Sequence, residues 1–162
     1  ESSSGRGRKG LNPAARIIPV RFRRSHNEGA LMFHYETEPR FSDTDALGHI
    51  NNTVYPVWFE QARTPVFRIF HPSLEPKGWP LILARMEIDL KAQCYWATPV
   101  KVRSGIGKVG NSSFEVIQEA WQNGVLVARG VTVLIHFDYE TQKSVPIPEA
   151  VRSELAVHTF EA

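Results

Sequence analysis

Residues 43–55 read Asp43-Thr44-Asp45-Ala46-Leu47-Gly48-His49-Ile50-Asn51-Asn52-Thr53-Val54-Tyr55, and this stretch is the most informative part of the chain. Two carboxylates, an imidazole and two carboxamides are crowded into it. Turn-forming and cap-forming residues dominate, which predicts a loop that leads into a helix. Gly48 permits a backbone conformation that is closed to other residues.

These residue types suit acyl-transfer chemistry. The start of a helix offers free N–H groups and the positive end of a dipole, which can hold a developing oxyanion. A carboxylate beside it can attack a carbonyl carbon or activate water. The same Asp, Asn and Thr residues are also ordinary helix caps, so composition alone leaves both interpretations open.

The sequence predicts a helix from Thr53 to Phe70, because apolar residues recur there at three- and four-residue spacing. The apolar positions are Val54, Val57, Trp58, Ala62, Val66 and Ile69. Asn52 or Thr53 is expected to cap the first turn. Pro65 removes an interior hydrogen bond, so a kink or an early end is expected there.

Strands are expected on both sides of this helix. One runs over residues 31–41 into the Asp43 region. After a loop from Pro72 to Pro80, four runs rich in Val, Ile and Phe follow: Leu81 to Ala92, Val100 to Val109, Ser113 to Gln122 and Val125 to Phe137. Asn123-Gly124 is a strong hairpin signal, and Gly110-Asn111 is a second candidate turn. One strand, one long helix and four strands are typical of an α+β protein in which an antiparallel sheet buries one face on a single helix.

The length of 162 residues and the 42% hydrophobic content allow one domain with a tail. We expect a basic flexible tail over residues 1–28, the folded domain over 29–148 and a C-terminal extension over 149–162. Residues 1–24 hold seven of the 19 Lys and Arg residues: Arg6, Arg8, Lys9, Arg16, Arg21, Arg23 and Arg24. Few aromatic residues accompany them, so no nucleic-acid partner is expected, and a remnant of an organelle transit peptide is the alternative interpretation.

The remaining composition points to a soluble cytoplasmic protein without a cofactor. Cys94 is the single cysteine and is expected to be a buried, inert thiol, which fits a reducing compartment. No apolar run approaches the roughly 18 residues of a membrane span, and the N-terminus lacks the apolar stretch of a signal peptide. Asp43, Asp45 and His49 lack the spacing and the terminal glutamate of a calcium loop, so no metal site is expected.

The run from Arg40 to Tyr55, continued by Trp58-Phe59-Glu60-Gln61-Ala62-Arg63, resembles the 4-hydroxybenzoyl-CoA thioesterase-like branch of the hot-dog superfamily. The resemblance covers residues 30–145, and the order Asp-x-Asp-x-x-Gly-His-Ile-Asn-Asn-x-x-Tyr is long and specific. It implies a hot-dog fold, an antiparallel sheet wrapped around one long central helix. It also implies an acyl-CoA thioesterase that releases free acid and CoA. The alternatives are an acyl-ACP (acyl-carrier-protein) thioesterase and a non-catalytic acyl-CoA-binding protein.

The resemblance assigns roles to individual residues. Asp45 matches the catalytic carboxylate, a nucleophile or general base, and the backbone N–H near Asn52 would hold the thioester carbonyl. His49 matches a histidine of the carrier-protein enzymes, with a structural role in the loop as the alternative. The substrate-binding candidates are Gly48, Asn51, Tyr55 and Glu60. The family also pairs subunits along a sheet edge, so a homodimer or a dimer of dimers is expected.

Departures from the family pattern leave some roles open. Position 47 is Leu where the carrier-protein enzymes have Asn, and position 52 is Asn where many bacterial acyl-CoA thioesterases have His. Tyr55 is alternatively a core aromatic with a satisfied hydroxyl. Glu60 is alternatively solvated, or paired with Arg63 or Thr64.

Overall fold

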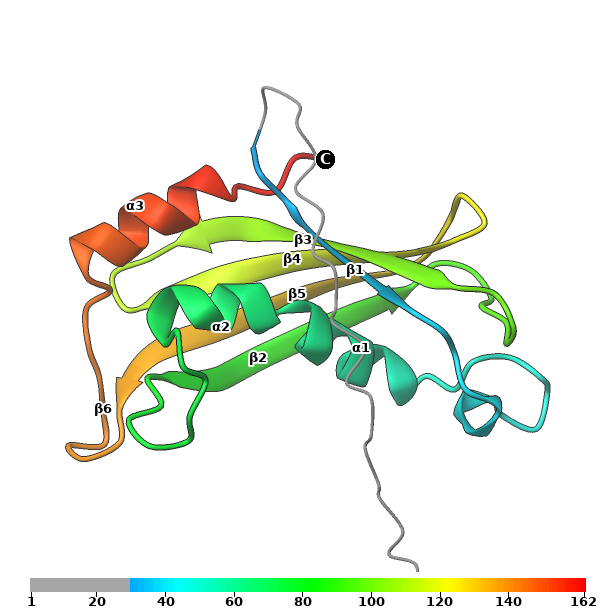
Figure 1. Ribbon diagram of the computed structural model, residues 1–162, viewed down its shortest axis with the longest axis horizontal. Coiled ribbons are helices and arrows are strands. Elements are labelled where there is room, and N and C mark those ends of the chain that lie inside the picture. The colour runs from blue at the N-terminus through cyan, green and yellow to red at the C-terminus, as the bar shows by residue number, and fades with distance from the viewer. Residues whose placement is uncertain (1–29) are drawn as a thin grey trace, which may run out of the picture.

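The structure is a computed structural model that describes residues 30–162 (Figure 1). The basic tail expected over residues 1–28 lies outside the described residues. From residue 30 onward the chain forms ten elements: β1 (Phe33–Thr37), η1 (Phe41–Asp43), α1 (Val54–Ala62), α2 (Thr64–Phe70), β2 (Leu81–Leu90), β3 (Val100–Val109), β4 (Ser113–Gln122), β5 (Val125–Asp138), β6 (Lys143–Ser144) and α3 (Glu149–Val157).

The strands form one curled antiparallel sheet in the order β1-β3-β4-β5-β2, with β6 added to the end of β5. The predicted bounds of β3 and β4 are confirmed. The hairpin at Asn123-Gly124 is also confirmed, because these residues have φ angles of 51° and 78° and join β4 to β5. The α+β prediction therefore holds.

The first strand is shorter than expected. β1 ends at Thr37, and the chain then turns into the short η1 helix, so the expectation of a strand running into the Asp43 region is wrong. Pro39 lacks the N–H that a sheet ladder requires. Beyond it, the Asp43 side chain accepts the backbone N–H of Arg40 and closes a tight turn instead.

The helix over residues 54–70 lies against the concave face of the sheet, but it is not one long helix (Figure 1). It is divided into α1 and α2 at Arg63, which has φ −82° and ψ −7°. Pro65 lies in the first turn of α2, where its missing N–H costs nothing. The early end that Pro65 predicts is thus confirmed, whereas the single long helix is corrected.

The main core lies between α1 and the sheet. Tyr55, Trp58, Phe59 and Ala62 are all buried on the sheet-facing side of α1. Gly130 of β5 lies directly beneath Phe59, and a Cβ atom there would be 2.6 Å from the Phe59 ring. The absence of a side chain at this position therefore sets how closely α1 approaches the sheet.

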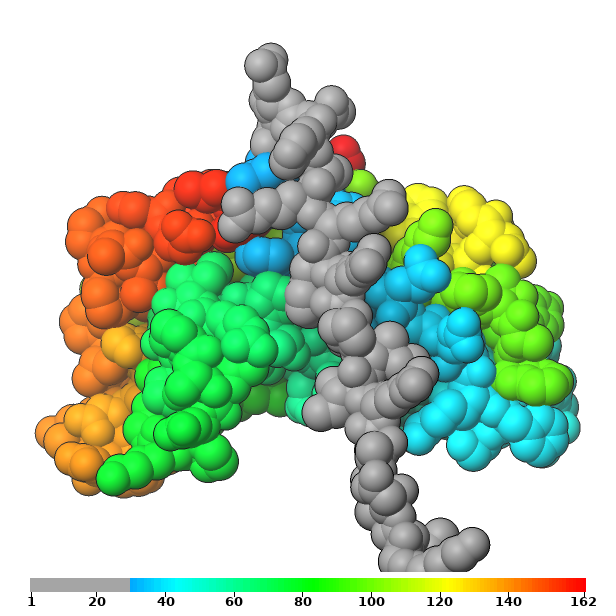
Figure 2. All heavy atoms as spheres, viewed as in Figure 1, coloured from blue at the N-terminus to red at the C-terminus, as the bar shows by residue number. Residues whose placement is uncertain are grey.

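The C-terminal residues pack on the domain rather than trail from it. Helix α3 contacts α2, and Figure 2 shows the two side by side on one face of the molecule. After α3 the chain pairs with β3: the Ile106 N–H donates to the His158 carbonyl at 2.7 Å, and the Phe160 N–H donates to the Ile106 carbonyl at 2.8 Å. Leu155 of α3 is fully buried in a second apolar cluster.

Within residues 30–162, no helix combines the length and the apolar character that crossing a bilayer requires.

Candidate active site

The loop between β1 and α1 is closed by its own backbone. The Asp45 N–H donates to the His49 carbonyl at 2.8 Å, and the Asn51 N–H donates to the Asp43 carbonyl at 2.8 Å. Gly48 takes φ 80°, the left-handed conformation that glycine tolerates. The predicted loop is therefore a fixed turn that precedes the helix, and it holds Asp45 near its tip.

The Asp45 carboxylate is held by one of its two oxygens. Oδ1 accepts the backbone N–H groups of Leu47, at 2.8 Å, and of His49, at 3.1 Å. Within residues 30–162, Oδ2 has no hydrogen-bond partner, and the residue is only partly buried. The turn thus orients this carboxylate and leaves one oxygen available.

The neighbouring carboxylate, Asp43, is in the opposite situation. It is buried, and Arg40 binds both of its oxygens through the backbone N–H (2.8 Å), Nε (3.0 Å) and Nη2 (2.7 Å). Burial by itself raises the pKa of Asp43, but the hydrogen bonds and the charge of Arg40 hold that pKa below its ordinary value. Asp43 is consequently committed to holding the loop.

Capping at the start of α1 differs from the prediction. Neither Asn52 nor Thr53 caps the helix through its side chain. Asn51 Oδ1 instead accepts the N–H of Thr53 at 3.0 Å and its hydroxyl at 2.8 Å. Among the described residues, the Asn52 N–H donates to no acceptor, and its side chain is exposed.

His49 contacts a segment far away in the sequence. Its ring packs edge-on against Tyr95 with 5.4 Å between the ring centroids, and neither ring nitrogen forms a hydrogen bond within residues 30–162. The side chain of Gln122 in β4 holds this segment in place. Its Oε1 accepts the N–H of Tyr95, and its Nε2 donates to the carbonyls of Tyr95 and Thr98. Gln122 was not predicted as a site residue, although its place directly before the Asn123-Gly124 turn is a signal that a polar side chain lies at this end of the sheet.

Tyr55 lies in the core below the loop. It is buried, it packs edge-on against Trp58 at 5.5 Å, and its hydroxyl lies beside the Cys94 thiol. Burial, together with the neighbouring thiol, raises its pKa well above the ordinary value. Burial likewise raises the pKa of Cys94, against the opposing effect of its hydrogen bond with Tyr55. Cys94 is the buried thiol that the sequence predicts.

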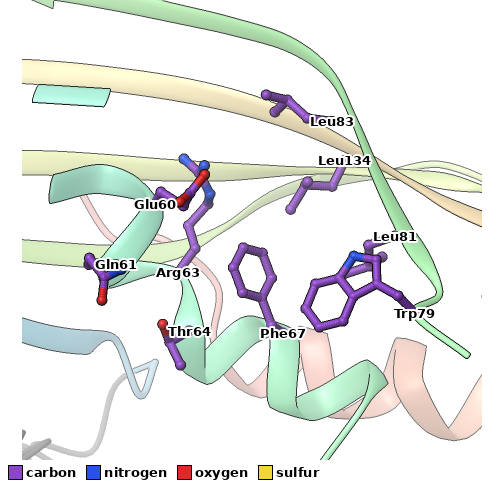
Figure 3. A pocket seen from close by; sticks show the side chains of 9 residues that line it. All are labelled: Glu60, Gln61, Arg63, Thr64, Phe67, Trp79, Leu81, Leu83 and Leu134. Atoms are coloured by element: carbon purple, nitrogen blue, oxygen red, sulfur yellow. The ribbon is translucent and has the colours of Figure 1, made fainter. Parts of the chain in front are cut away.

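A cavity of about 330 Å³ lies at the junction of α1 and α2 (Figure 3), and no residue of the Asp45 loop lines it. Its lining residues are Glu60, Gln61, Arg63, Thr64, Phe67, Trp79, Leu81, Leu83 and Leu134. Glu60 is exposed and makes no salt bridge with Arg63. The solvated interpretation of Glu60 is therefore confirmed, and its pairing with Arg63 is wrong because the guanidinium turns into the core.

Arg63 is a buried polar residue, although it is not among the apolar helix positions that the sequence predicts. It is 2% exposed, and its Nη1 donates to Gln118 Oε1 at 3.1 Å and to Thr132 Oγ1 at 3.0 Å. Gln118 in turn donates to the Phe59 carbonyl and the Ser104 hydroxyl. These side chains tie the helix break to the middle of the sheet.

Among residues 30–162, no three His, Cys, Asp or Glu side chains lie close enough together to hold a metal ion. The arrangement around Asp45 offers two groups without a hydrogen-bond partner among the described residues, Oδ2 of Asp45 and the backbone N–H of Asn52.

Comparison with known families gives a direct match. The Thioesterase-like superfamily matches residues 39–155. Among curated proteins, the uncharacterised protein YsmA of Bacillus subtilis is 26% identical over 129 residues, which cover 78% of this chain and 86% of the relative.

Solved structures agree with this match. A predicted thioesterase from Bacillus stearothermophilus is 41% identical, has a TM-score of 0.79, and is matched over 98% of its length by 81% of this chain. A thioesterase from Thermus thermophilus, solved in complex with coenzyme A and Zn, is 28% identical with a TM-score of 0.67. That match covers 78% of this chain and 98% of the Thermus protein.

Proposed function

Because the chain belongs to the Thioesterase-like superfamily and is a thioester hydrolase, we propose that it hydrolyses acyl-CoA to a free acid and CoA, with Asp45 as the catalytic carboxylate. One observation supports Asp45 rather than Asp43 as the catalytic carboxylate. Its Oδ1 is fixed by two backbone N–H groups while Oδ2 has no partner among the described residues. Both oxygens of Asp43 are bound by Arg40.

Two routes use the same carboxylate oxygen. As a general base, Asp45 takes a proton from water as the water oxygen bonds to the carbonyl carbon; the C–S bond then breaks, and the proton returns to the CoA thiolate. As a nucleophile, the Asp45 carboxylate attacks the carbonyl carbon and the C–S bond breaks, so an anhydride forms and the CoA thiolate leaves and takes up a proton; water then hydrolyses the anhydride, which releases the free acid and restores the Asp45 carboxylate. In both routes the Asn52 N–H donates to the carbonyl oxygen as negative charge develops on it.

The carrier of the acyl group is proposed to be coenzyme A. The Thermus relative was solved with coenzyme A, which supports this choice. The acyl-ACP alternative rests on His49, four residues after Asp45 as in enzymes that act on carrier proteins. The roles of Gly48, Asn51, Tyr55 and Glu60 in substrate binding remain proposals. The single, buried Cys94 accords with the proposed cytoplasmic location.

We also propose a homodimer formed through β2. One edge of β2 pairs with β5, and no described strand pairs with the other. Three large apolar residues of this strand are exposed: Ile82, Leu83 and Leu90. An open edge with exposed apolar side chains favours pairing with the same strand of a second copy, which extends the sheet across a two-fold axis.

The decisive test is release of free CoA. A panel of acyl-CoA thioesters of different chain lengths should yield one equivalent of thiol each at a protein-dependent rate, followed with a chromogenic thiol reagent. The same acyl groups on acyl carrier protein form the comparison arm. Faster turnover on the carrier protein would replace coenzyme A with the carrier protein, and binding of acyl-CoA without thiol release would replace the enzyme with a binding protein.

A further inference from the structure

The cavity at the α1–α2 junction has two kinds of wall (Figure 3). Phe67, Trp79, Leu81 and Leu134 supply aromatic and apolar surface. Arg63 supplies a positive charge from the helix break. A volume of about 330 Å³ lies at the lower end of the range for sites that hold a small organic molecule.

Hydrogen bonds from one nitrogen, Nη1, fix the orientation of the Arg63 guanidinium. Nη1 is committed to Gln118 and Thr132. The opposite edge carries Nε and Nη2, and neither atom makes a hydrogen bond within residues 30–162. Nε is also buried away from water. The two N–H groups on this edge point in the same direction, and this pair matches the two oxygens of a carboxylate.

Arg63 forms no salt bridge within residues 30–162, and Glu60 is a nearby acid whose charge acts on it. No Asp or Glu among the described residues lies within salt-bridge distance of it. Burial lowers the pKa of Arg63 to about 10, and the charge of nearby Glu60 opposes this effect, so the group stays protonated at neutral pH. An unpaired buried cation is costly, and pairing it with an anion offsets that cost.

We propose that this cavity binds the carboxylate of an organic acid with an apolar or aromatic body, and that the Nε and Nη2 edge of Arg63 is its receptor. The body of the acid packs against Phe67, Trp79 and Leu134. Exposed Glu60 lies on the rim and weakens the binding of an anion, so its removal strengthens binding.

The carboxylate that binds Arg63 can come from one of two kinds of molecule. It belongs either to a free monocarboxylic acid, such as the product of hydrolysis, or to the far end of the acyl group of a dicarboxylic monothioester. The second source rests on the proposed acyl-CoA hydrolase function and makes Arg63 a determinant of acyl specificity. Binding of a free acid that is supplied from solution does not depend on the hydrolase function.

Equilibrium binding to the full chain tests the site directly. The probes are 3-phenylpropionate and its neutral amide, and the readout is fluorescence of Trp79, checked by loss of the signal in Trp79→Phe. In the wild type, the carboxylate should bind at least about tenfold more tightly than the amide, because a charge-assisted pair replaces a neutral contact. Equal affinities, or no binding of either probe, would overturn the proposal.

Variants assign the selectivity to the guanidinium edge. Arg63→Lys keeps the charge but loses the two-donor edge, and Arg63→Met loses both, so the ratio of affinities should fall in the order wild type, Lys, Met. Glu60→Gln should tighten binding of the carboxylate without changing that of the amide. The wild-type comparison of carboxylate and amide decides the question even if the core variants do not fold.

Kinetics separates the two sources. If adipoyl-CoA has a kcat/KM about tenfold above that of hexanoyl-CoA and Arg63→Lys removes the preference, the carboxylate is that of the acyl group. If both thioesters are hydrolysed equally while 3-phenylpropionate inhibits, it is that of the free acid. If neither thioester is hydrolysed but 3-phenylpropionate still binds selectively, the carboxylate site stands and the proposed function fails.

Discussion

Replacement of Gly130 by alanine tests how α1 is held on the sheet. The added Cβ would lie 2.6 Å from Cε2 and 2.9 Å from Cδ2 of Phe59. Carbon atoms in contact normally lie about 3.5–4.0 Å apart, so the ring or the helix must move by about 1 Å. Phe59 is fully buried in the core between α1 and the sheet, so a shift of its ring disturbs the core. Overpacking of this kind costs about 1–3 kcal/mol of unfolding free energy.

The measurement is urea unfolding of wild type, Gly130→Ala, Phe59→Leu and the double variant. Phe59→Leu removes the ring atoms that the new Cβ would meet, so the double variant should be more stable than the sum of the single losses predicts, by about 1 kcal/mol or more. A fully stable Gly130→Ala, or strictly additive losses, would refute the close packing of α1 on β5.

Four further outcomes follow from the fold and the loop. Asp43→Asn should lower the unfolding free energy by about 1–2 kcal/mol at neutral pH. Since Arg40 depresses the pKa of Asp43 in the folded state, this contribution is present above the ordinary Asp pKa of about 3.9 and is lost as pH falls through the lower pKa of the folded state. The urea unfolding curves of wild type and Asp43→Asn should therefore converge in strong acid, and curves that stayed apart would contradict this. Cys94 should react with a thiol reagent only on unfolding, because it is buried and its pKa is raised, and fast labelling of the native protein would contradict this. Gly124→Ala should cost about 1 kcal/mol in thermal or urea unfolding, because φ there is 78°, and an unchanged midpoint would argue against the turn. Leu83→Lys should convert a dimer to a monomer in sedimentation, and a wild type that is itself monomeric would rule out the β2 interface.

Local signals account for most of the fold that the sequence predicts. Alternating β-branched residues and the Asn123-Gly124 turn are sufficient to place β3, β4 and the hairpin, because strand bounds and turn chemistry depend on neighbouring residues. The break near Pro65 is predicted for the same reason. Helix α3 was not predicted, since its packing against α2 depends on distant parts of the chain.

In the candidate site, too, local sequence signals predict some features, and contacts with distant residues decide the others. The sequence shows Asp43 and Asp45 as a pair, but only the contacts of Arg40 separate a carboxylate that holds the loop from one with a free oxygen. Arg63 is not among the apolar positions that helical spacing selects, and its burial depends on Gln118 and Thr132, which lie 55 and 69 residues away. Such spacing carries no information about partners at that separation.

Asp45→Asn keeps the shape of the side chain and the oxygen that accepts the Leu47 and His49 N–H groups, but it removes the basic oxygen. The measurement is kcat for thiol release from an acyl-CoA that the wild type turns over, together with the affinity of each protein for CoA. We expect a fall in kcat of about 10²- to 10⁴-fold, or about 3–5 kcal/mol of transition-state stabilisation, with CoA affinity nearly unchanged. Asp43→Asn should lose less activity than Asp45→Asn under the same conditions. Near-wild-type turnover by Asp45→Asn, with activity abolished in Asp43→Asn or Glu60→Gln, would contradict it.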